Sequence, residues 1–464
     1  MAATLVTRIR MYRLHELGDC FLVSFLLSGK PVSHMLIDCG SFRNNKKSIA
    51  RLKLIAEDIR TTLDKAPLNV VVGTHQHNDH LSGFVHCEAV FKRIGIDQVW
   101  LSWLDDPSDP TARKIGEKHS KIQKKLVEIG KLRGGGRAVQ TISEMLGFYG
   151  AGKPGAVPVL PDRAVKILRK IGKRKPAYLE PGRSLDMPGL AAGMVKIHVL
   201  GPPLSDTDLY RKNPHKGESY DHALAAMGMS ATRLFNAAIG GPETAREEEN
   251  YPFGLSYKRQ RRTEYSKSLA NMVDLYQRRG DNWRTIDDDW LNQAEALALF
   301  MDKFTNNSSL ALAIELVGSG KVLLFPADAQ TGNWTSWNDV VWENDKIRTD
   351  SLLKRTVFYK VGHHASHNAT LVDAFEKMND PRLTALIPVH KEDPNIAKKD
   401  GWKMPARNLY EEIKKRTANR VLRMDGADPP ECQPQRQPAR ASWTEIGVTP
   451  KTTKLYIELD IADE

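Results

Sequence analysis

Residues 69–80 read Asn69-Val70-Val71-Val72-Gly73-Thr74-His75-Gln76-His77-Asn78-Asp79-His80, a short apolar run followed at once by three histidines and an aspartate. The β-branched run predicts a strand buried on both faces, and the Gly-Thr pair turns the chain out of the sheet. Zinc binds imidazole nitrogen and carboxylate oxygen, and hydrolytic zinc sites keep one position open for water. A polar loop that happens to be rich in histidine is the competing explanation. The spacing favours a metal site at the carboxyl end of this strand.

The polar part of this stretch resembles the His-x-His-x-Asp-His signature of the metallo-β-lactamase fold, with the signature positions occupied by His75, His77, Asp79 and His80. Other segments follow in the order of that fold. Residues 18–25 and 35–40 look like its opening hairpin, and the resemblance would bring Asp38 and Gly40 near the metal.

A second ligand is expected after the apolar runs 309–316 and 321–325, which predict a hairpin because residues 317–320 between them are rich in glycine. The hairpin leads into Pro326-Ala327-Asp328-Ala329, which looks like the family's Gly-Asp-Ala element, whose aspartate bridges two metal ions. An aspartate at a strand end is otherwise commonly a turn former or a helix cap. In this context we interpret Asp328 as a ligand.

The run 356–362 ends in His363-His364-Ala365-Ser366-His367, which is similar to the His-His-Gly-Ser element of metallohydrolase domains attached to competence-type DNA uptake channels. One histidine of the pair should complete the second metal site while the other lines the pocket, and we favour His363 as the ligand. Adjacent strand residues point to opposite faces, so both bind the metal only if the chain turns there. His364 or His367 would protonate the leaving oxygen, because imidazole titrates near neutrality.

One histidine that the resemblance implies is missing. The strand 195–203 has Gly201 at the expected ligand position, and His198 lies three residues too early. His215 and His222 follow in a polar segment and would reach the metal only if that segment folds back. The protein ligands left for the first ion are His75, His77 and Asp328. A weaker site or a single-metal site is therefore an alternative.

We expect a single domain over residues 1–464, with a basic helical insertion at 105–190 and a second insertion at 204–306. Alternating strands and helices indicate an α/β protein, and the resemblance implies a metallo-β-lactamase αββα sandwich with large, mainly helical insertions. Residues 453–461 alternate apolar and polar side chains as a final edge strand would.

Positive charge is concentrated in one part of the chain. The whole sequence carries 68 Lys and Arg against 56 Asp and Glu, a net charge of +12, whereas residues 111–175 alone carry 17 against 4, a net charge of +13. Apolar spacing predicts helices over 115–132, ended by the glycines 134–136, and over 163–171. Lysine-rich helices are often only solvated faces. The functional alternative is a patch that attracts a polyanion beside the metal.

No run approaches the ~20 apolar residues that span a bilayer. Residues 1–10 show no signal peptide, and the four cysteines lack Cys-x-x-Cys spacing. These features predict a cytoplasmic protein without membrane contact. The sequence does not identify a protein partner.

The predicted function is that of a hydrolase in which metal-bound hydroxide attacks a phosphodiester. One or two zinc ions are expected, with manganese as the alternative metal. In a two-ion site the second ion would be held by Asp79, His80, Asp328 and His363 or His364. Nucleic acid or a nucleotide is the expected substrate, because the competence-like motifs and the basic insertion both favour phosphate.

Two other functions stay open. The first is hydrolysis of a lactam, lactone or thioester, which would need a compact apolar pocket. The second is a nucleic-acid-binding scaffold with a degenerate metal site, as Gly201, Ala327 and Ala365 hint by departing from the family pattern.

Overall fold

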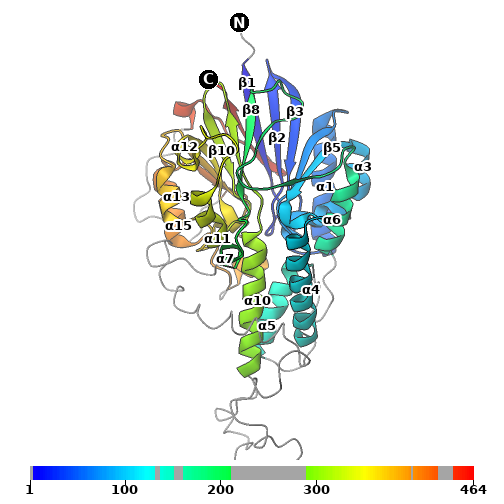
Figure 1. Cartoon of the computed structure of the whole chain (residues 1–464). Helices are drawn as coiled ribbons and strands as arrows, with labels where there is room; N and C mark the ends of the chain where they lie inside the picture. Colours follow the sequence, from blue (N-terminus) through cyan, green and yellow to red (C-terminus); the bar gives the residue numbers. More distant parts are fainter. Residues whose placement is uncertain (1–3, 131–135, 151–159, 211–288, 399–400, 427–442) are drawn as a thin grey trace, which may run out of the picture.

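The computed structural model of the protein contains two mixed β-sheets flanked by helices (Figure 1). The structure describes residues 4–130, 136–150, 160–210, 289–398, 401–426 and 443–464. The α/β class expected from the sequence is confirmed.

The first sheet contains eight strands within the described residues, in the order β14-β15-β1-β2-β3-β4-β5-β6. Strands β3 to β6 pair in parallel, and the other neighbours pair antiparallel. The strands are β1 (Leu5–Tyr12), β2 (Phe21–Leu27), β3 (Lys30–Ile37), β4 (Leu68–Gly73), β5 (Ile96–Ser102), β6 (Ala177–Leu179), β14 (Lys451–Thr452) and β15 (Tyr456–Ala462).

The second sheet contains seven strands in the described part, in the order β13-β12-β11-β10-β9-β8-β7. Here β10 to β13 pair in parallel, while β7, β8, β9 and β10 form antiparallel neighbours. The strands are β7 (Ser184–Asp186), β8 (Val195–Gly201), β9 (Ala311–Leu316), β10 (Lys321–Phe325), β11 (Thr356–Lys360), β12 (Thr384–Ile387) and β13 (Val421–Arg423).

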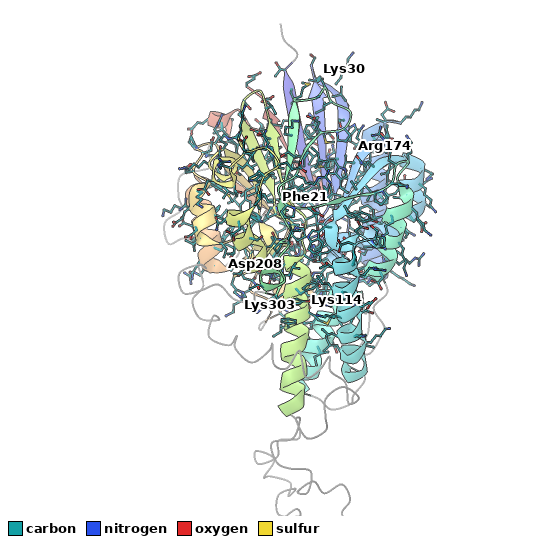
Figure 2. The ribbon with its side chains drawn as sticks, in the orientation of Figure 1. Phe21, Lys30, Lys114, Arg174, Asp208 and Lys303 are labelled. Carbon is teal, nitrogen blue, oxygen red and sulfur yellow. The ribbon has the colours of Figure 1, made fainter. Side chains whose placement is uncertain are left out.

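The two sheets pack face to face through an apolar core. Phe21 of β2 lies at the centre of the molecule (Figure 2), and its ring centroid is 5.8 Å from that of Phe325 in β10. Side chains alternate along β10, so Leu323 and Phe325 join the core between the sheets while Val322 and Leu324 face the helices outside. The strands that bear the candidate ligands are thereby buried on both faces.

Helices cover the outer faces of the sheets (Figure 1). On the side of the first sheet they are α1 (Lys46–Leu63), α2 (Asn78–His86), α3 (Glu88–Ile94) and α6 (Leu160–Ile171). On the side of the second they are α11 (Thr331–Ser336), α12 (Thr349–Lys354), α13 (Val372–Lys377), α14 (Pro394–Ala397) and α15 (Arg407–Arg416). The longest of these, α1, begins at its cap Asn45 and buries Leu52, Ile55 and Ile59, whose spacing places them on one helix face.

Three helices, α4 (Pro110–Gly130), α5 (Gly136–Phe148) and α10 (Asp289–Asn307), pack together and extend beyond one end of the sheets (Figure 1). The short helix α7 (Asp206–Leu209) packs beside α10. Buried residues of α4 include Ile115, Ile122 and Leu126, as the apolar spacing predicted. The sequence did not predict α5, because the glycines before it were interpreted only as the end of the preceding helix.

Two details differ from expectation. Strand β15 is not an edge strand: it pairs with β1 on one side and with the two-residue β14 on the other. The segment 105–190 is not wholly helical, since its end supplies β6 and β7, one strand to each sheet. In the described part of the chain, no helix combines the length and apolarity needed to cross a membrane.

Candidate metal centre

The candidate ligands meet at one edge of the two sheets because they follow strands that end there. His75 to His80 follow β4, Asp328 follows β10, and His364 follows β11. Asp19 lies just before β2, whose start is beside the end of its antiparallel partner β3. Ligand sites in α/β sheets commonly lie at the carboxyl ends of parallel strands.

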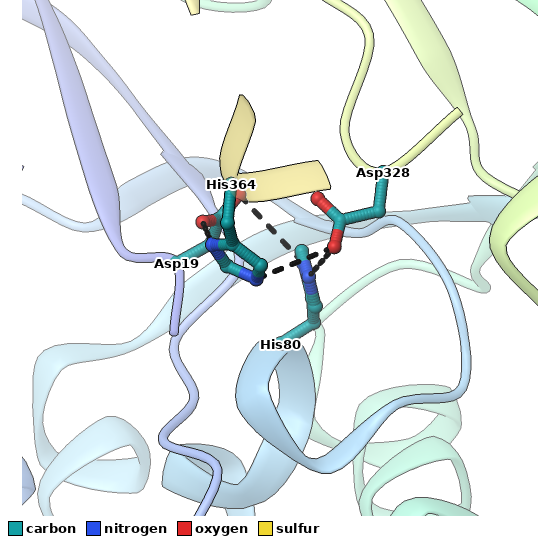
Figure 3. Close-up of side chains that lie close together, drawn as sticks. All are labelled: Asp19, His80, Asp328 and His364. Carbon is teal, nitrogen blue, oxygen red and sulfur yellow. Dashed lines mark ion pairs between the residues drawn. The ribbon is translucent and has the colours of Figure 1, made fainter. Parts of the chain in front are cut away.

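Four buried side chains form the cluster shown in Figure 3: Asp19, His80, Asp328 and His364. One ligand atom from each lies within 4.8 Å of the other three. Oδ2 of Asp328 is 3.1 Å from Nε2 of His80 and 3.4 Å from Nε2 of His364. Two imidazoles and two carboxylates at this separation offer a donor set that zinc and manganese accept. The cluster could therefore hold a metal ion.

Hydrogen bonds behind the rings direct both Nε2 atoms into the cluster. Nδ1 of His80 lies 2.7 Å from Oδ2 of Asp38, and Nδ1 of His364 lies 2.8 Å from the carbonyl oxygen of Pro388. Each of these oxygens accepts a hydrogen bond from the Nδ1–H, which leaves the Nε2 lone pair for a cation in the neutral ring. Thr74 holds Asp38 in turn, since its hydroxyl donates to Oδ2 over 2.6 Å.

The remaining residues of the signature lie beside the cluster. Oδ2 of Asp79 is 3.0 Å from Nε2 of His364, and its Oδ1 has no hydrogen-bond partner in the described structure. Nε2 of His75 is 3.1 Å from Nδ1 of His77. Burial lowers the pKa of His77 to about 3, so its ring is neutral, as a metal ligand must be.

Several buried polar atoms around the cluster form no hydrogen bond to any described residue. They are Oδ1 of Asp19, Nε2 of His77, Oδ1 of Asp79, Nε2 of His80 and Oδ1 of Asp302. A buried polar atom without a partner lowers the stability of the fold. A bound cation would supply a partner for the carboxylate oxygens and for the imidazole lone pairs at the same time. The residues present therefore fit a bound cation.

Sequence reasoning favoured His363 over His364 as the ligand, and the structure places His364 in the cluster instead. The chain turns sharply after β11, with positive φ angles of 38° at His363 and 51° at His364. Nδ1 of His363 lies 2.6 Å from the hydroxyl of Ser366 and 3.1 Å from Nε2 of Gln330, outside the cluster. His367 is half-buried and also lies outside it.

The structure offers no histidine at the position of Gly201. A Cβ there would lie 2.2 Å from Oδ1 of Asn333, so this position is closed to any side chain unless Asn333 moves. His198 faces away and contacts Ser184 and Glu315, each over 2.8 Å. The other two histidines considered, at positions 215 and 222, lie outside the described residues.

Three buried residues at the centre were not assigned from the sequence. Asp19 is a member of the cluster. Asp302, from α10, has Oδ1 3.7 Å from Nε2 of His77, and burial together with Asp79 raises its pKa to about 7. Lys360, the last residue of β11, has Nζ 2.5 Å from Oδ2 of Asp19 and 3.0 Å from Oδ1 of Asp328.

A pocket of about 340 Å³ opens next to the metal centre on the side of His75, which forms part of its wall. Helices α4 and α6, the end of α10 and the segment after β5 complete the wall. Both insertions therefore contribute to the surroundings of the metal centre. A second group of possible ligands, His15, His390 and Glu392, is largely exposed and makes no contact that extends this centre.

Cation binding is expected to release protons and to strengthen as pH rises. Burial opposes a charge on His80, but Asp328 and Asp38 raise its pKa well above the usual value; Asp328 and Asp79 likewise raise the pKa of His364 against the effect of burial. A raised pKa means that each ring holds its second proton more strongly in the cation-free protein, and a cation must displace that proton from a charged ring. Affinity should rise by about tenfold per pH unit for each proton displaced.

Isothermal titration calorimetry with zinc in two buffers of different ionisation enthalpy measures this release. Measurable proton release on cation binding near pH 7 is the expected result. A pH-independent affinity with no proton release would contradict it.

No protein-family model matches this chain, and no curated protein matches it.

Proposed function

We propose that the protein is a metal-dependent hydrolase of the metallo-β-lactamase fold that cleaves phosphodiesters. The observation that carries the proposal is the convergence of Asp19, His80, Asp328 and His364, from four separate chain segments, on one buried cluster. Convergence of imidazoles and carboxylates with unpaired atoms is typical of a site for a divalent cation.

Backbone geometry also supports the resemblance to that fold. Ala327 and Ala365 occupy the two positions where the family motifs have glycine, and their φ angles are 53° and 58°. Glycine adopts this left-handed region without steric cost, whereas alanine does so rarely. The backbone thus keeps the conformation that the glycine motifs favour, which argues against reading the two alanines as signs of a degenerate site.

A divalent cation at this centre would act as a Lewis acid and lower the pKa of a bound water from 15.7 to about 7. In a two-ion site, His75 and His77 would hold the first ion; Asp79, His80 and His364 would hold the second, with Asp328 between the two. Should one ion bind, Asp79 would orient the water through its free Oδ1 and accept its proton. Hydrolysis adds one water across the P–O bond and yields a phosphate monoester and a hydroxyl.

Exposed positive charge beside the pocket favours a phosphate substrate. The exposed basic residues of α4 and α6 include Arg113, Lys114, Lys121, Lys124, Arg163, Lys166 and Lys170. Basic surface near a cleft raises the local concentration of polyanions. A lactam or thioester substrate gains nothing from such a surface.

A paired assay with manganese and with zinc tests the proposal by offering bis(p-nitrophenyl) phosphate and a chromogenic lactam side by side. We expect turnover of the phosphodiester, lowered by about 10²- to 10⁴-fold in Asp79→Asn because a positioned proton acceptor is lost. The matched control is Asp186→Asn, a half-exposed carboxylate of β7, which should keep full activity.

Two outcomes would contradict the proposal. Turnover of the lactam alone, abolished by Asp79→Asn, would establish a different hydrolase. Fewer than one tightly bound ion per chain and turnover of neither substrate would favour the scaffold.

A further inference from the structure

The pocket beside His75 is built from parts of the chain that lie outside the metal motifs. Arg113, Gly116, Ser120 and Gln123 line it from α4, and their spacing of three and four residues places them on one helix face. Ala112 and Ile115 of the same helix also line the pocket, whereas Ile122 and Leu126 pack against the neighbouring helices. The pocket wall formed by α4 is therefore part polar and part apolar.

Aromatic rings form another part of the wall. The ring centroid of His119 lies 5.7 Å from that of Tyr149 and 5.1 Å from that of Phe304, and all three line the pocket. The hydroxyl of Tyr149 is held by Thr305 over 2.7 Å, which fixes the ring between the two insertions. Tyr149 and Phe304 are buried, so these rings form an apolar wall against which a nucleobase can pack.

Polar groups complete the lining with hydrogen-bonding capacity. The amide of Gln123 and the hydroxyl of Ser120 face the pocket from α4, and each can both donate and accept a hydrogen bond. Arg113 is exposed on the same wall and forms no ion pair with a described residue, so its guanidinium is available to a phosphate. Three carboxylates, of Asp105, Asp106 and Asp162, and the guanidinium of Arg169 also line the pocket, so the lining offers acceptors for the amino group of a base as well as donors for a phosphate.

The volume limits what can enter. Pockets for small molecules span about 300–1,000 Å³, and this pocket of about 340 Å³ lies at the lower end. That space accepts one nucleotide unit and excludes a duplex or a stacked run of bases.

We propose that this pocket binds a single nucleotide unit next to the metal centre, so that the protein acts on the end of a single strand or on a small nucleotide diester. The inference rests on the proposed phosphodiesterase function for its reaction, but the binding it describes is measurable without catalysis. The base packs against the aromatic wall, and the phosphate lies on the side of His75.

Gly116→Trp is the sharpest test of the pocket. A Cβ at Gly116 meets no heavy atom within 4 Å, and Gly116 lines the pocket, so a large side chain there starts in open space at the pocket wall. Replacing a glycine within a helix also reduces the entropy lost on folding. The matched control is Thr111→Trp, which adds the same ring at an exposed position of α4 outside the pocket.

Binding of adenosine 5′-monophosphate to the full chain loaded with manganese is measured by calorimetry. We expect saturable binding in the wild type and in Thr111→Trp, and at least about tenfold weaker binding in Gly116→Trp, with unchanged metal content. Equal nucleotide affinity in all three proteins, or no saturable binding in the wild type, would overturn the inference.

Cleavage assays separate this inference from the proposed function. Linear single-stranded DNA should be degraded at least about tenfold faster than circular single-stranded DNA of the same sequence, because only a free end enters the pocket. Cleavage of both substrates at the same measurable rate would overturn it. Nucleotide binding that Gly116→Trp abolishes, without cleavage of any phosphodiester, would uphold the pocket and contradict the proposed function.

Discussion

Replacing Asp328 with alanine is expected to lower the affinity for zinc or manganese by more than about 100-fold. Loss of a residue that only hydrogen-bonds to a metal ligand typically lowers metal affinity by about 10- to 100-fold. Asp328 would itself bind the cation, so its loss should lower the affinity further. Its Oδ2 is the atom that lies close to both His80 and His364, so its removal takes away the contact that joins the two imidazoles. Metal content by mass spectrometry and affinity by calorimetry measure the effect.

Hydrolysis should fall with the metal, by at least about 10³-fold, because Lewis-acid stabilisation is worth several kcal/mol in such reactions. The control is Glu315→Ala, which removes another largely buried carboxylate that pairs with a histidine. Glu315 is a suitable control because it lies away from the metal centre. Strand β9 begins beside Thr74 near that centre, and Glu315 lies toward the other end of the strand. Full metal content in Asp328→Ala, or equal losses in both variants, would contradict the assignment.

Several strands and two of the long helices were predictable because their signals are local. The β-branched runs before His75 and His363 gave β4 and β11, and apolar spacing gave α4 and α6. Helix α5 escaped prediction because its glycine-rich start resembles a helix end. Its placement depends on contacts with α4 and α10, which are distant in the sequence.

The site was predictable where a motif places the ligands close together in sequence, as with His80 and Asp79. The sequence could not show that His364 rather than His363 lies in the cluster, because alternation along a strand does not continue through a turn with positive φ angles. Asp19 and Asp302 carry no local signal, since an aspartate before a strand or within a helix is usually a cap or a solvated residue. Only the tertiary structure brings them to the centre.

Lys360 adds a positive charge to a centre that otherwise gathers carboxylates, and this explains how the cation-free fold tolerates them. Its Nζ contacts Asp19, Asp328 and the carbonyl oxygen of Ala327, the last over 2.7 Å. Although burial disfavours its charge, the two carboxylates raise the pKa of Lys360, so it stays protonated across the physiological range. The ammonium group therefore neutralises part of the cluster whether or not a divalent cation is bound.

Lys360→Met is accordingly expected to destabilise the cation-free protein by about 3–5 kcal/mol, the usual cost of leaving a buried charge without its partner. Bound zinc or manganese should recover much of that loss, because the cation compensates the same two carboxylates. Denaturant unfolding with chelator and with saturating metal measures both values. Lys377→Met removes a partly exposed lysine paired with the exposed Asp350, and should cost no more than about 1 kcal/mol in either condition. If Lys360→Met lowers the free energy of unfolding equally with and without metal, Lys360 acts by packing alone. The charge of the cluster would then not limit the stability of the fold.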